Sequence, residues 1–221
     1  MSETSSHITV IFIGIAGPSG CGKSTYGKYL AEHLHSPFYP IQLDHFFNDP
    51  LILNHSILGS IESYEQPECL NLHNFFNLLY QIKQNPKQTT RYHREDILIN
   101  NNTTIFIIVE GFLLFALSDE ITNIFDIKIF LDSTLSECRV QRYRRRNKIC
   151  PTIPNENIIV TEKFQQWFDH LVWDEYLKHR DVQMTRADKV FHSNEYKQKQ
   201  YRSLDDYIVQ RVREILVLDG Q

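Results

Sequence analysis

The segment Gly17–Ser24 is the sequence feature that most constrains the fold of this chain. It reads Gly-Pro-Ser-Gly-Cys-Gly-Lys-Ser and matches the pattern G-x-x-x-x-G-K-[ST]. The β-branched run Ile8–Ala16 before it predicts a buried strand, and apolar spacing predicts a helix over Lys23–His35. Glycines let such a loop curl so that backbone N–H groups point at phosphate oxygens, and the helix N-terminus adds positive charge. Strand, loop and helix together predict a site for nucleotide phosphates.

Each residue type in this loop has an expected chemical role. Lys23 is expected to reach the β- and γ-phosphates of a nucleotide, and the Ser24 hydroxyl is expected to bind Mg²⁺. ATP and Mg²⁺ are therefore the expected cofactors. The other residues expected to contact phosphate are Gly17, Ser19, Gly20, Cys21, Gly22 and Thr25. The order of the glycines does not fit G-x-G-x-x-G, so a dinucleotide site of that class is excluded.

The rest of the chain alternates predicted strands with predicted helices. Strands are expected at Ile8–Ala16, Phe38–Leu43, Thr104–Val109, Ile127–Leu131 and Lys189–Phe191, and helices at 23–35, 68–84, 134–147, 161–180 and 203–217. Residues 84–104 are polar and predict a long loop or a weak hairpin. Such alternation predicts an α/β three-layer sandwich, in which helices cover both faces of a parallel sheet of about five strands. No repeat or linker is visible, so a single domain over 1–221 is expected.

Composition excludes several function classes. With 42% hydrophobic residues the chain is not expected to be disordered, and a net charge of −4 argues against a nucleic-acid or membrane partner. Residues 139–148 hold six basic and no acidic residues, so the remainder carries 17 basic and 27 acidic residues. No apolar run is long enough to span a bilayer. Four cysteines without C-x-x-C spacing indicate a reducing compartment, so a cytoplasmic location is expected.

The motifs favour a small-molecule kinase among the nucleotide-binding classes. A switch GTPase would need D-x-x-G, which is absent, and a final Asp that Asn147-Lys148-Ile149-Cys150 lacks. Motor ATPases usually need a longer chain. A small kinase needs a base beside the acceptor hydroxyl, an acid beside the metal and arginines that close over phosphates. A nucleotide-binding regulatory module without transfer activity stays open as a non-enzyme alternative.

Candidates for these three roles follow the predicted strands. Asp44 ends the second strand and could accept the proton of an attacking hydroxyl, or merely cap the next turn. Glu110 ends the third strand, where a buried charge needs a partner such as metal-bound water. The basic residues open a segment at about 139–160 that is expected to form a helical lid over phosphates. A solvated charged face is the alternative interpretation.

Four stretches resemble the uridine kinase-like family of P-loop nucleoside kinases, and within it the nicotinamide riboside kinases. They are Gly17–Thr25, Leu43–Phe47, Val109–Phe115 and Phe168–Lys178. The phosphate loop is shared by many kinases, whereas the last two stretches are more selective. The resemblance implies a P-loop kinase fold and transfer of phosphate from ATP to the 5′-hydroxyl of nicotinamide riboside or nicotinic acid riboside, for NAD synthesis.

The resemblance also implies roles for individual residues within a nucleoside-binding segment at about 44–66 and in the lid. Asp44 contacts the ribosyl 5′-hydroxyl as the base, Phe47 lines the nucleoside pocket, and Tyr64 stacks on the nicotinamide ring. The acidic and basic residues implied to bind are Glu65 and Arg142 for ribose, Glu110 for the metal side, and Arg145 and Arg146 for phosphate. Arg142 also counts among the catalytic residues.

Some features depart from the family pattern and keep alternatives open. Glu65 is one methylene longer than the usual Asp, which puts the ribose geometry in doubt. Tyr92-His93-Arg94 is similar to the base-reading stretch of uridine kinases, so uridine or cytidine remains the alternative acceptor. Trp167 and Trp173 are expected to be core residues. The sequence does not distinguish a monomer from a homodimer.

Overall fold

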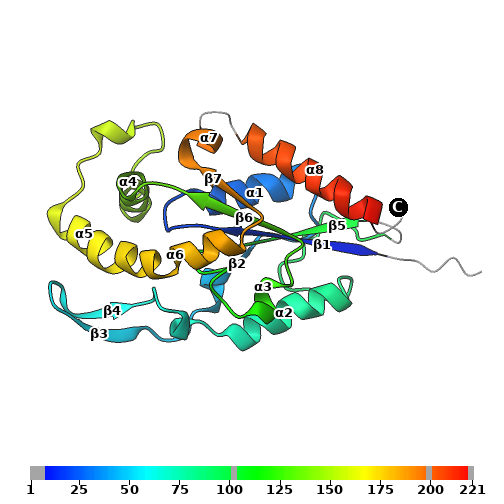
Figure 1. Ribbon diagram of the computed structural model, residues 1–221, viewed down its shortest axis with the longest axis horizontal. Coiled ribbons are helices and arrows are strands. Elements are labelled where there is room, and N and C mark those ends of the chain that lie inside the picture. The colour runs from blue at the N-terminus through cyan, green and yellow to red at the C-terminus, as the bar shows by residue number, and fades with distance from the viewer. Residues whose placement is uncertain (1–7, 101–103, 198–200, 219–221) are drawn as a thin grey trace, which may run out of the picture.

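A five-stranded parallel sheet organises the computed structural model, which describes residues 8–100, 104–197 and 201–218. The strand order is β2-β5-β1-β6-β7 (Figure 1). The strands are β1 (Thr9–Ala16), β2 (Ile41–Gln42), β5 (Thr104–Gly111), β6 (Ile127–Asp132) and β7 (Lys189–His192). All five predicted strands are therefore confirmed. β2 is shorter than predicted because Pro40 cannot donate to a sheet ladder and Leu43–Phe46 turn into a 3₁₀ helix.

Alternating residues of β1 pack into two cores on opposite faces of the sheet. Ile11, Ile13 and Ile15 face one cluster, and Phe12 and Ala16 face the other. The helices of the two layers are α1 (Lys23–His33), α4 (Leu135–Arg146) and α8 (Arg202–Leu218) on the first cluster, and α2 (Leu72–Gln84) and α3 (Asp119–Thr122) on the second. Figure 1 shows α1 and α8 above the sheet and α2 and α3 below it. The predicted three-layer sandwich is confirmed.

The helix predicted over 161–180 is interrupted. The structure has α5 (Glu162–Trp167), then a π-helical turn over Phe168–Trp173, then α6 (Asp174–Arg186), which ends beyond the predicted boundary. A π turn shifts the phase of the apolar face by a fraction of a turn, so the sequence still suggested one continuous helix. α4 begins at the capping box of Thr134 and Glu137, as expected.

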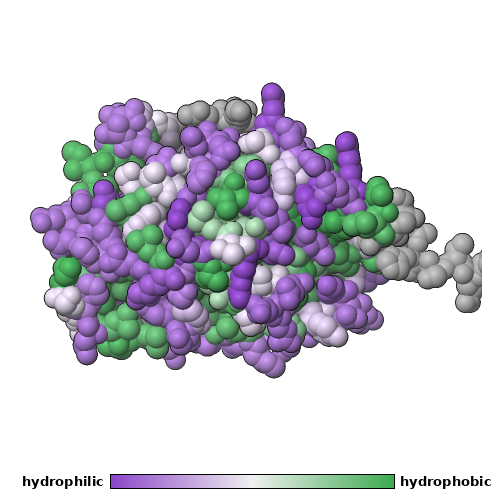
Figure 2. Space-filling model, in the orientation of Figure 1, coloured by the Kyte–Doolittle hydropathy of each residue, from purple (hydrophilic) through white to green (hydrophobic). Residues whose placement is uncertain are grey.

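An antiparallel hairpin, β3 (Leu51–His55) and β4 (Gly59–Ser63), lies outside the main sheet and was not predicted. Gly59, the first residue of β4 after the turn, has a φ of 71°, a conformation that favours glycine. Several apolar side chains of this hairpin are exposed, including Ile52 and Ile57. Figure 2 shows apolar residues gathered at the corner where the hairpin lies, on a face that is otherwise mostly hydrophilic.

The polar segment after α2 forms a loop in the part that the structure describes. Residues 85–100 contain no strand, and a single bridge joins His93 to Phe38. Residues 101–103 lie outside the described ranges. A short helix, α7 (Ser193–Lys197), follows β7. In the described ranges, no helix is both long and apolar enough to cross a membrane.

Candidate active site

The phosphate loop joins the end of β1 to the start of α1, and three of its glycines adopt positive φ angles. A Cβ atom at Gly17 would lie 2.4 Å from the Leu131 carbonyl oxygen, and one at Gly20 would lie 2.4 Å from that of Cys138. Only glycine allows the loop to approach β6 and α4 this closely. The Tyr196 hydroxyl donates a hydrogen bond of 2.9 Å to the Cys21 carbonyl, which further fixes the loop. Gly17 and Cys21 therefore fix the shape of the loop through their contacts with Leu131 and Tyr196.

Lys23 is buried at the first turn of α1, and its ammonium donates to the Pro18 carbonyl at 3.3 Å. Burial works to lower the pKa of this ammonium, but the neighbouring negative charges outweigh it and the pKa is raised. Those neighbours include Glu110 and Asp44. A lysine that stays charged while buried beside two carboxylates can attract and hold a polyphosphate.

Two adjoining cavities open beside this lysine. We call the first the lid cavity; it has a volume of about 430 Å³ and lies between the phosphate loop and α4 with the loop after it. The second, the hairpin cavity, has a volume of about 470 Å³ and lies between the phosphate loop, the end of the β3–β4 hairpin and the π turn. Both cavities are lined by Lys23, Ser24, Arg142 and Arg145. Two ligands bound in these cavities would meet at these four side chains.

The lid cavity contains most of the loop residues expected to contact phosphate. Gly20, Gly22, Lys23, Ser24 and Thr25 line it, and Ser19 lines the hairpin cavity. The rest of its lining comes from α4 and the segment after it and includes Arg144, Lys148 and Pro151. Backbone N–H groups at the start of a helix and several cations suit a polyphosphate.

The hairpin cavity brings together the residues that the sequence indicated for the second substrate. Asp44, Phe47, Tyr64 and Glu65 all line it. Asp44 stands on the 3₁₀ turn directly after β2, and Tyr64 and Glu65 follow β4. The Phe47 ring packs 5.1 Å from that of Tyr64, centroid to centroid, so both rings form one aromatic wall. Asp44 is exposed to the cavity and available to a hydroxyl group there.

The Glu65 carboxyl group in the hairpin cavity has a raised pKa. Burial raises the pKa of Glu65 to about 7, and the negative charge of Asp44 adds to this rise, while Lys23 and Arg145 oppose it. Glu65 therefore changes its charge near neutral pH. A cationic ligand in the cavity would favour the ionised form of this carboxyl group.

Other residues of the hairpin cavity were missed by sequence reasoning. Trp167 packs against the core, as expected, and it also lines the cavity, where it is joined by Asn48, Glu62, Ser63, Phe112 and Leu171. Trp173 packs against the core, as expected. Phe112 lies within the Val109–Phe115 stretch, and Trp167 and Leu171 lie at or beside the start of Phe168–Lys178. The two selective stretches could therefore have pointed to this wall.

The arginines of α4 have different surroundings, although the sequence treats them as one basic cluster. Arg142 and Arg145 reach both cavities. Arg146 lies instead over the rings of Phe164 and Trp167, at 5.8 and 5.5 Å from their centroids, and lines neither cavity. The faces of these two aromatic rings attract its guanidinium.

A further arginine organises the loop that follows α4. Arg144 donates to the carbonyls of Cys150 and Ile153 and to the Asn155 side chain, with bonds of 2.5 to 2.7 Å. These bonds hold the first half of the predicted lid segment against its second half. The Arg144 guanidinium therefore makes most of its hydrogen bonds within this segment.

The two residues expected on the metal side differ in their access to the cavities, because Ser24 lines both and Glu110 lines neither. Glu110 is 4% exposed at the carboxyl end of β5, and its charge acts on Lys23, while Ser24 lines both cavities. No cluster of three carboxylate, imidazole or thiol groups suited to a metal occurs in the described part of the chain. Mg²⁺ at phosphates needs few protein ligands, because phosphate oxygens and waters complete its shell. The Ser24 hydroxyl, which lines both cavities, fits that requirement.

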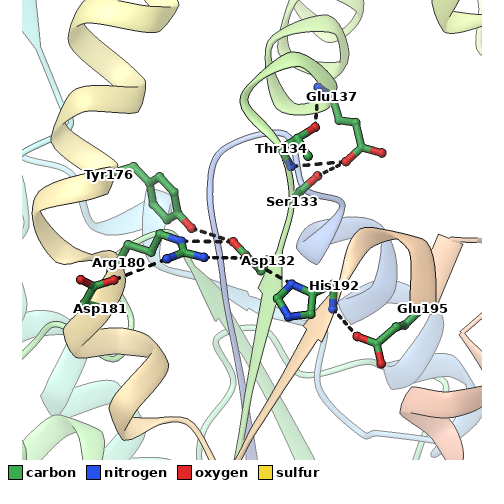
Figure 3. A network of polar contacts seen from close by, with 9 residues as sticks. All are labelled: Asp132, Ser133, Thr134, Glu137, Tyr176, Arg180, Asp181, His192 and Glu195. Carbon is green, nitrogen blue, oxygen red and sulfur yellow. Dashed lines mark hydrogen bonds and ion pairs between the residues drawn. The ribbon is translucent and has the colours of Figure 1, made fainter.

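A polar network centred on the buried Asp132 holds the elements around the phosphate loop. Figure 3 shows Tyr176 and Arg180 of α6 and His192 of β7 pointing at Asp132, the last residue of β6. The Arg180 guanidinium donates to Asp132 at 2.7 Å, the Tyr176 hydroxyl donates at 3.2 Å, and His192 Nδ1 lies 3.3 Å away. Since the neighbouring residue Leu131 touches Gly17, this network fixes α6 and β7 beside the loop.

Comparisons with known proteins agree with this architecture. Residues 12–149 match the model of the phosphoribulokinase/uridine kinase family. Over 148 residues, 62% of this chain, the sequence is 32% identical to a uridine kinase of Schizosaccharomyces pombe, covering 32% of that protein. A uridine kinase of Limosilactobacillus reuteri is 26% identical over 147 residues, 63% of this chain and 66% of that protein. The aligned part thus spans about a third of the Schizosaccharomyces pombe protein and about two thirds of the Limosilactobacillus reuteri protein.

A solved structure supports the fold alone. It is a Silicibacter sp. protein provisionally described as a fructose transport system kinase, with a TM-score of 0.51 and 16% identity, and the match covers 86% of this chain and 93% of that protein. The family model, by contrast, includes the phosphate loop, Asp44, Glu110 and the lid arginines. The chain belongs to the phosphoribulokinase/uridine kinase family.

Proposed function

We propose that this chain is a Mg²⁺-dependent kinase that transfers the γ-phosphoryl group of ATP to the 5′-hydroxyl of nicotinamide riboside, a step toward NAD. The lid cavity is the site of ATP, and the hairpin cavity is the site of the riboside. The observation that carries the choice of substrate is the lining of the hairpin cavity, which combines aromatic rings with carboxylates.

The chemistry of this lining suits a flat cation joined to a ribose. Phe47, Tyr64 and Trp167 offer aromatic faces, and such faces attract cations. The pyridinium ring of nicotinamide riboside is both flat and positively charged. Glu62 and Glu65 add negative charge on the same side. A neutral base would gain less from these carboxylates, and Glu65 would keep its proton more readily beside it.

The phosphoryl transfer follows from the residues at the junction of the cavities. Asp44 accepts the proton of the 5′-hydroxyl as that oxygen attacks the γ-phosphorus, and the bond to the ADP oxygen breaks. Lys23, Arg142 and Arg145 stabilise the negative charge that spreads over the transferred group. Mg²⁺, held by the Ser24 hydroxyl with Glu110 on its water shell, would supply further neutralisation of the phosphates.

Uridine or cytidine is the second candidate acceptor, because the curated relatives are named uridine kinases. The stretch that could read a pyrimidine base contacts His45, the residue after Asp44, but does not reach the lining of the hairpin cavity. Tyr92, His93 and Arg94, all within the described residues, do not line the hairpin cavity. His93 packs edge-on against Phe38, and the Tyr92 hydroxyl lies 2.9 Å from His45 Nδ1. This arrangement favours the cationic riboside.

A panel of nucleosides tests the proposed acceptor. With ATP and Mg²⁺, we expect nicotinamide riboside to give a kcat/KM at least about tenfold above those of uridine and cytidine, since one lost charged contact costs about this factor. Acceptor-dependent ADP release measures it. Faster turnover of uridine or cytidine would overturn the choice of substrate. ADP release that no nucleoside stimulates would favour a regulatory module instead.

The charge of Glu65 gives a second test. Because its pKa is raised to about 7, the carboxyl is neutral below that pH and ionised above it, so kcat/KM for nicotinamide riboside should rise as pH increases through about 7. The Glu65→Gln variant should lose this rise and about tenfold in kcat/KM at pH 8, which is the scale of one charged hydrogen bond. Glu68→Gln, an exposed neighbour, is the matched control. An unchanged pH profile in Glu65→Gln would remove Glu65 from acceptor binding.

A further inference from the structure

An ion pair outside both cavities connects the elements that carry their walls. The Arg139 guanidinium on α4 donates to the Asp169 carboxylate in the π turn, with Nη1 and Oδ2 2.6 Å apart. The two side chains are 19% and 20% exposed, so water screens the pair only in part. Neither residue lines the lid cavity or the hairpin cavity. The pair is therefore not a direct substrate contact.

The position of Arg139 ties it to the phosphate side of the site. Arg139, Arg142 and Arg145 are spaced by three residues along α4, so their side chains are neighbours on the helix surface. Arg142 and Arg145 line both cavities, whereas Arg139 stands one turn closer to the start of the helix. Any shift of α4 that brings Arg142 and Arg145 onto phosphate also moves Arg139.

The position of Asp169 ties it to the acceptor side. Its neighbours at two residues' distance on either side, Trp167 and Leu171, both line the hairpin cavity. Trp167 is the last residue of α5, and Leu171 lies in the π turn that follows, a type of irregularity that is frequent at functional sites. A displacement of Asp169 therefore also displaces the segment that carries Trp167 and Leu171, which form part of the lining of the hairpin cavity.

The bonding of the pair makes each partner dependent on the other. Arg139 Nε and Asp169 Oδ1 are buried without a hydrogen-bond partner in the structure. The bond between Nη1 and Oδ2 therefore offsets most of the free energy that is lost when the two charged groups leave water. Loss of either residue leaves a partly buried charge without its counter-ion. α4 and the π turn are thus expected to move together.

We propose that the Arg139–Asp169 ion pair couples ATP binding to acceptor binding, by joining the helix that carries the phosphate-binding arginines to the segment that carries Trp167 and Leu171. Arg139 and Asp169 are positioning residues that act through these neighbours. The proposal rests on the proposed kinase function, with ATP in the lid cavity and an acceptor in the hairpin cavity. Coupling of this kind is reciprocal, so each ligand tightens the other by the same factor.

The experiment measures that factor. The dissociation constant of the non-hydrolysable analogue AMP-PNP with Mg²⁺ is determined without acceptor and with saturating acceptor, which is nicotinamide riboside or whichever nucleoside the panel selects. The ratio is expected to be about tenfold in the unmodified protein and near one in Arg139→Gln and Asp169→Asn, within the usual range of coupling energies. Asp174→Asn, which alters an exposed pair with His170, is the matched control and should keep the full ratio.

Two further variants separate coupling from a structural role. The conservative Arg139→Lys variant and the charge-exchanged double variant Arg139→Asp with Asp169→Arg should each restore part of the ratio, because they retain opposite charges at the two positions. A ratio near one in the unmodified protein, or an unchanged ratio in folded single variants, would overturn the proposal. If the panel rejects nicotinamide riboside, the substrate proposal fails, while coupling is still measured with the selected nucleoside.

Discussion

Replacing Asp44 with Asn is expected to lower kcat by about 10²–10⁴-fold, the usual contribution of a positioned general base. Asn has nearly the same shape, so the hairpin cavity should keep its form and still bind the riboside. It cannot take the proton of the 5′-hydroxyl, however. Since Asp44 lines only the hairpin cavity, the dissociation constant for ATP should change little. Steady-state ADP release and equilibrium binding of AMP-PNP measure the two quantities.

The controls for Asp44 separate catalysis from turn formation. Asp49→Asn alters an exposed acid five residues further along, outside both cavities, and should leave kcat unchanged. If Asp44 serves only to cap the turn after β2, Asp44→Asn would lower the melting temperature and leave kcat close to normal. That outcome would remove Asp44 from the mechanism.

The elements that the sequence predicted well are those coded by local patterns. β1, the phosphate loop and α1 follow one another without a break, and each has its own signal in residue type and spacing. The capping box at Thr134 marked the start of α4 for the same reason. The parallel order of the sheet followed from the alternation of strands and helices. Local signals of this kind survive folding because neighbouring residues alone satisfy them.

The features that the sequence did not reveal depend on contacts between distant segments. The β3–β4 hairpin has mostly exposed residues, so it lacks the clear alternation by which a strand is identified. Trp167 is an aromatic residue on a predicted helix, and its spacing does not show that it lines the hairpin cavity as well as packing against the core. In both cases the position depends on tertiary packing that residue spacing does not encode.

The basic cluster shows how one sequence signal divides into several physical roles. As a run of like charges, residues 139–148 predicted a phosphate-binding lid as a whole. In the structure, Arg142 and Arg145 line both cavities, whereas Arg139 pairs with Asp169, Arg144 binds lid carbonyls and Arg146 lies on aromatic rings. The remaining acidic charge of the chain includes Asp44, Glu62 and Glu65 of the hairpin cavity. The cations proposed to bind phosphate and the carboxylates proposed to bind the acceptor thus lie in two adjoining cavities that share Lys23.

Replacing Lys23 with Ala is expected to lower kcat/KM for ATP by about 10²–10³-fold, the scale of losing one donor that stabilises transition-state charge. Lys23 is the buried cation common to both cavities, and the charges of Glu110 and Asp44 keep it protonated. Without it, those carboxylates would repel the incoming phosphates. Acceptor-dependent ADP release measures the loss, and AMP-PNP binding should weaken in parallel.

A loss of activity in Lys23→Ala must be distinguished from a loss of structure, because Glu110 would lose its positive neighbour. Lys23→Arg keeps a positive charge beside Glu110 but replaces the compact ammonium with a larger, planar guanidinium, so it should be more stable than Lys23→Ala and still lose most of the activity. Lys28→Ala, an exposed lysine further along α1, is the matched control and should retain full activity. Full activity in both Lys23 variants would contradict the role of the loop in phosphate binding, since Lys23 is the cation that the loop itself contributes to both cavities.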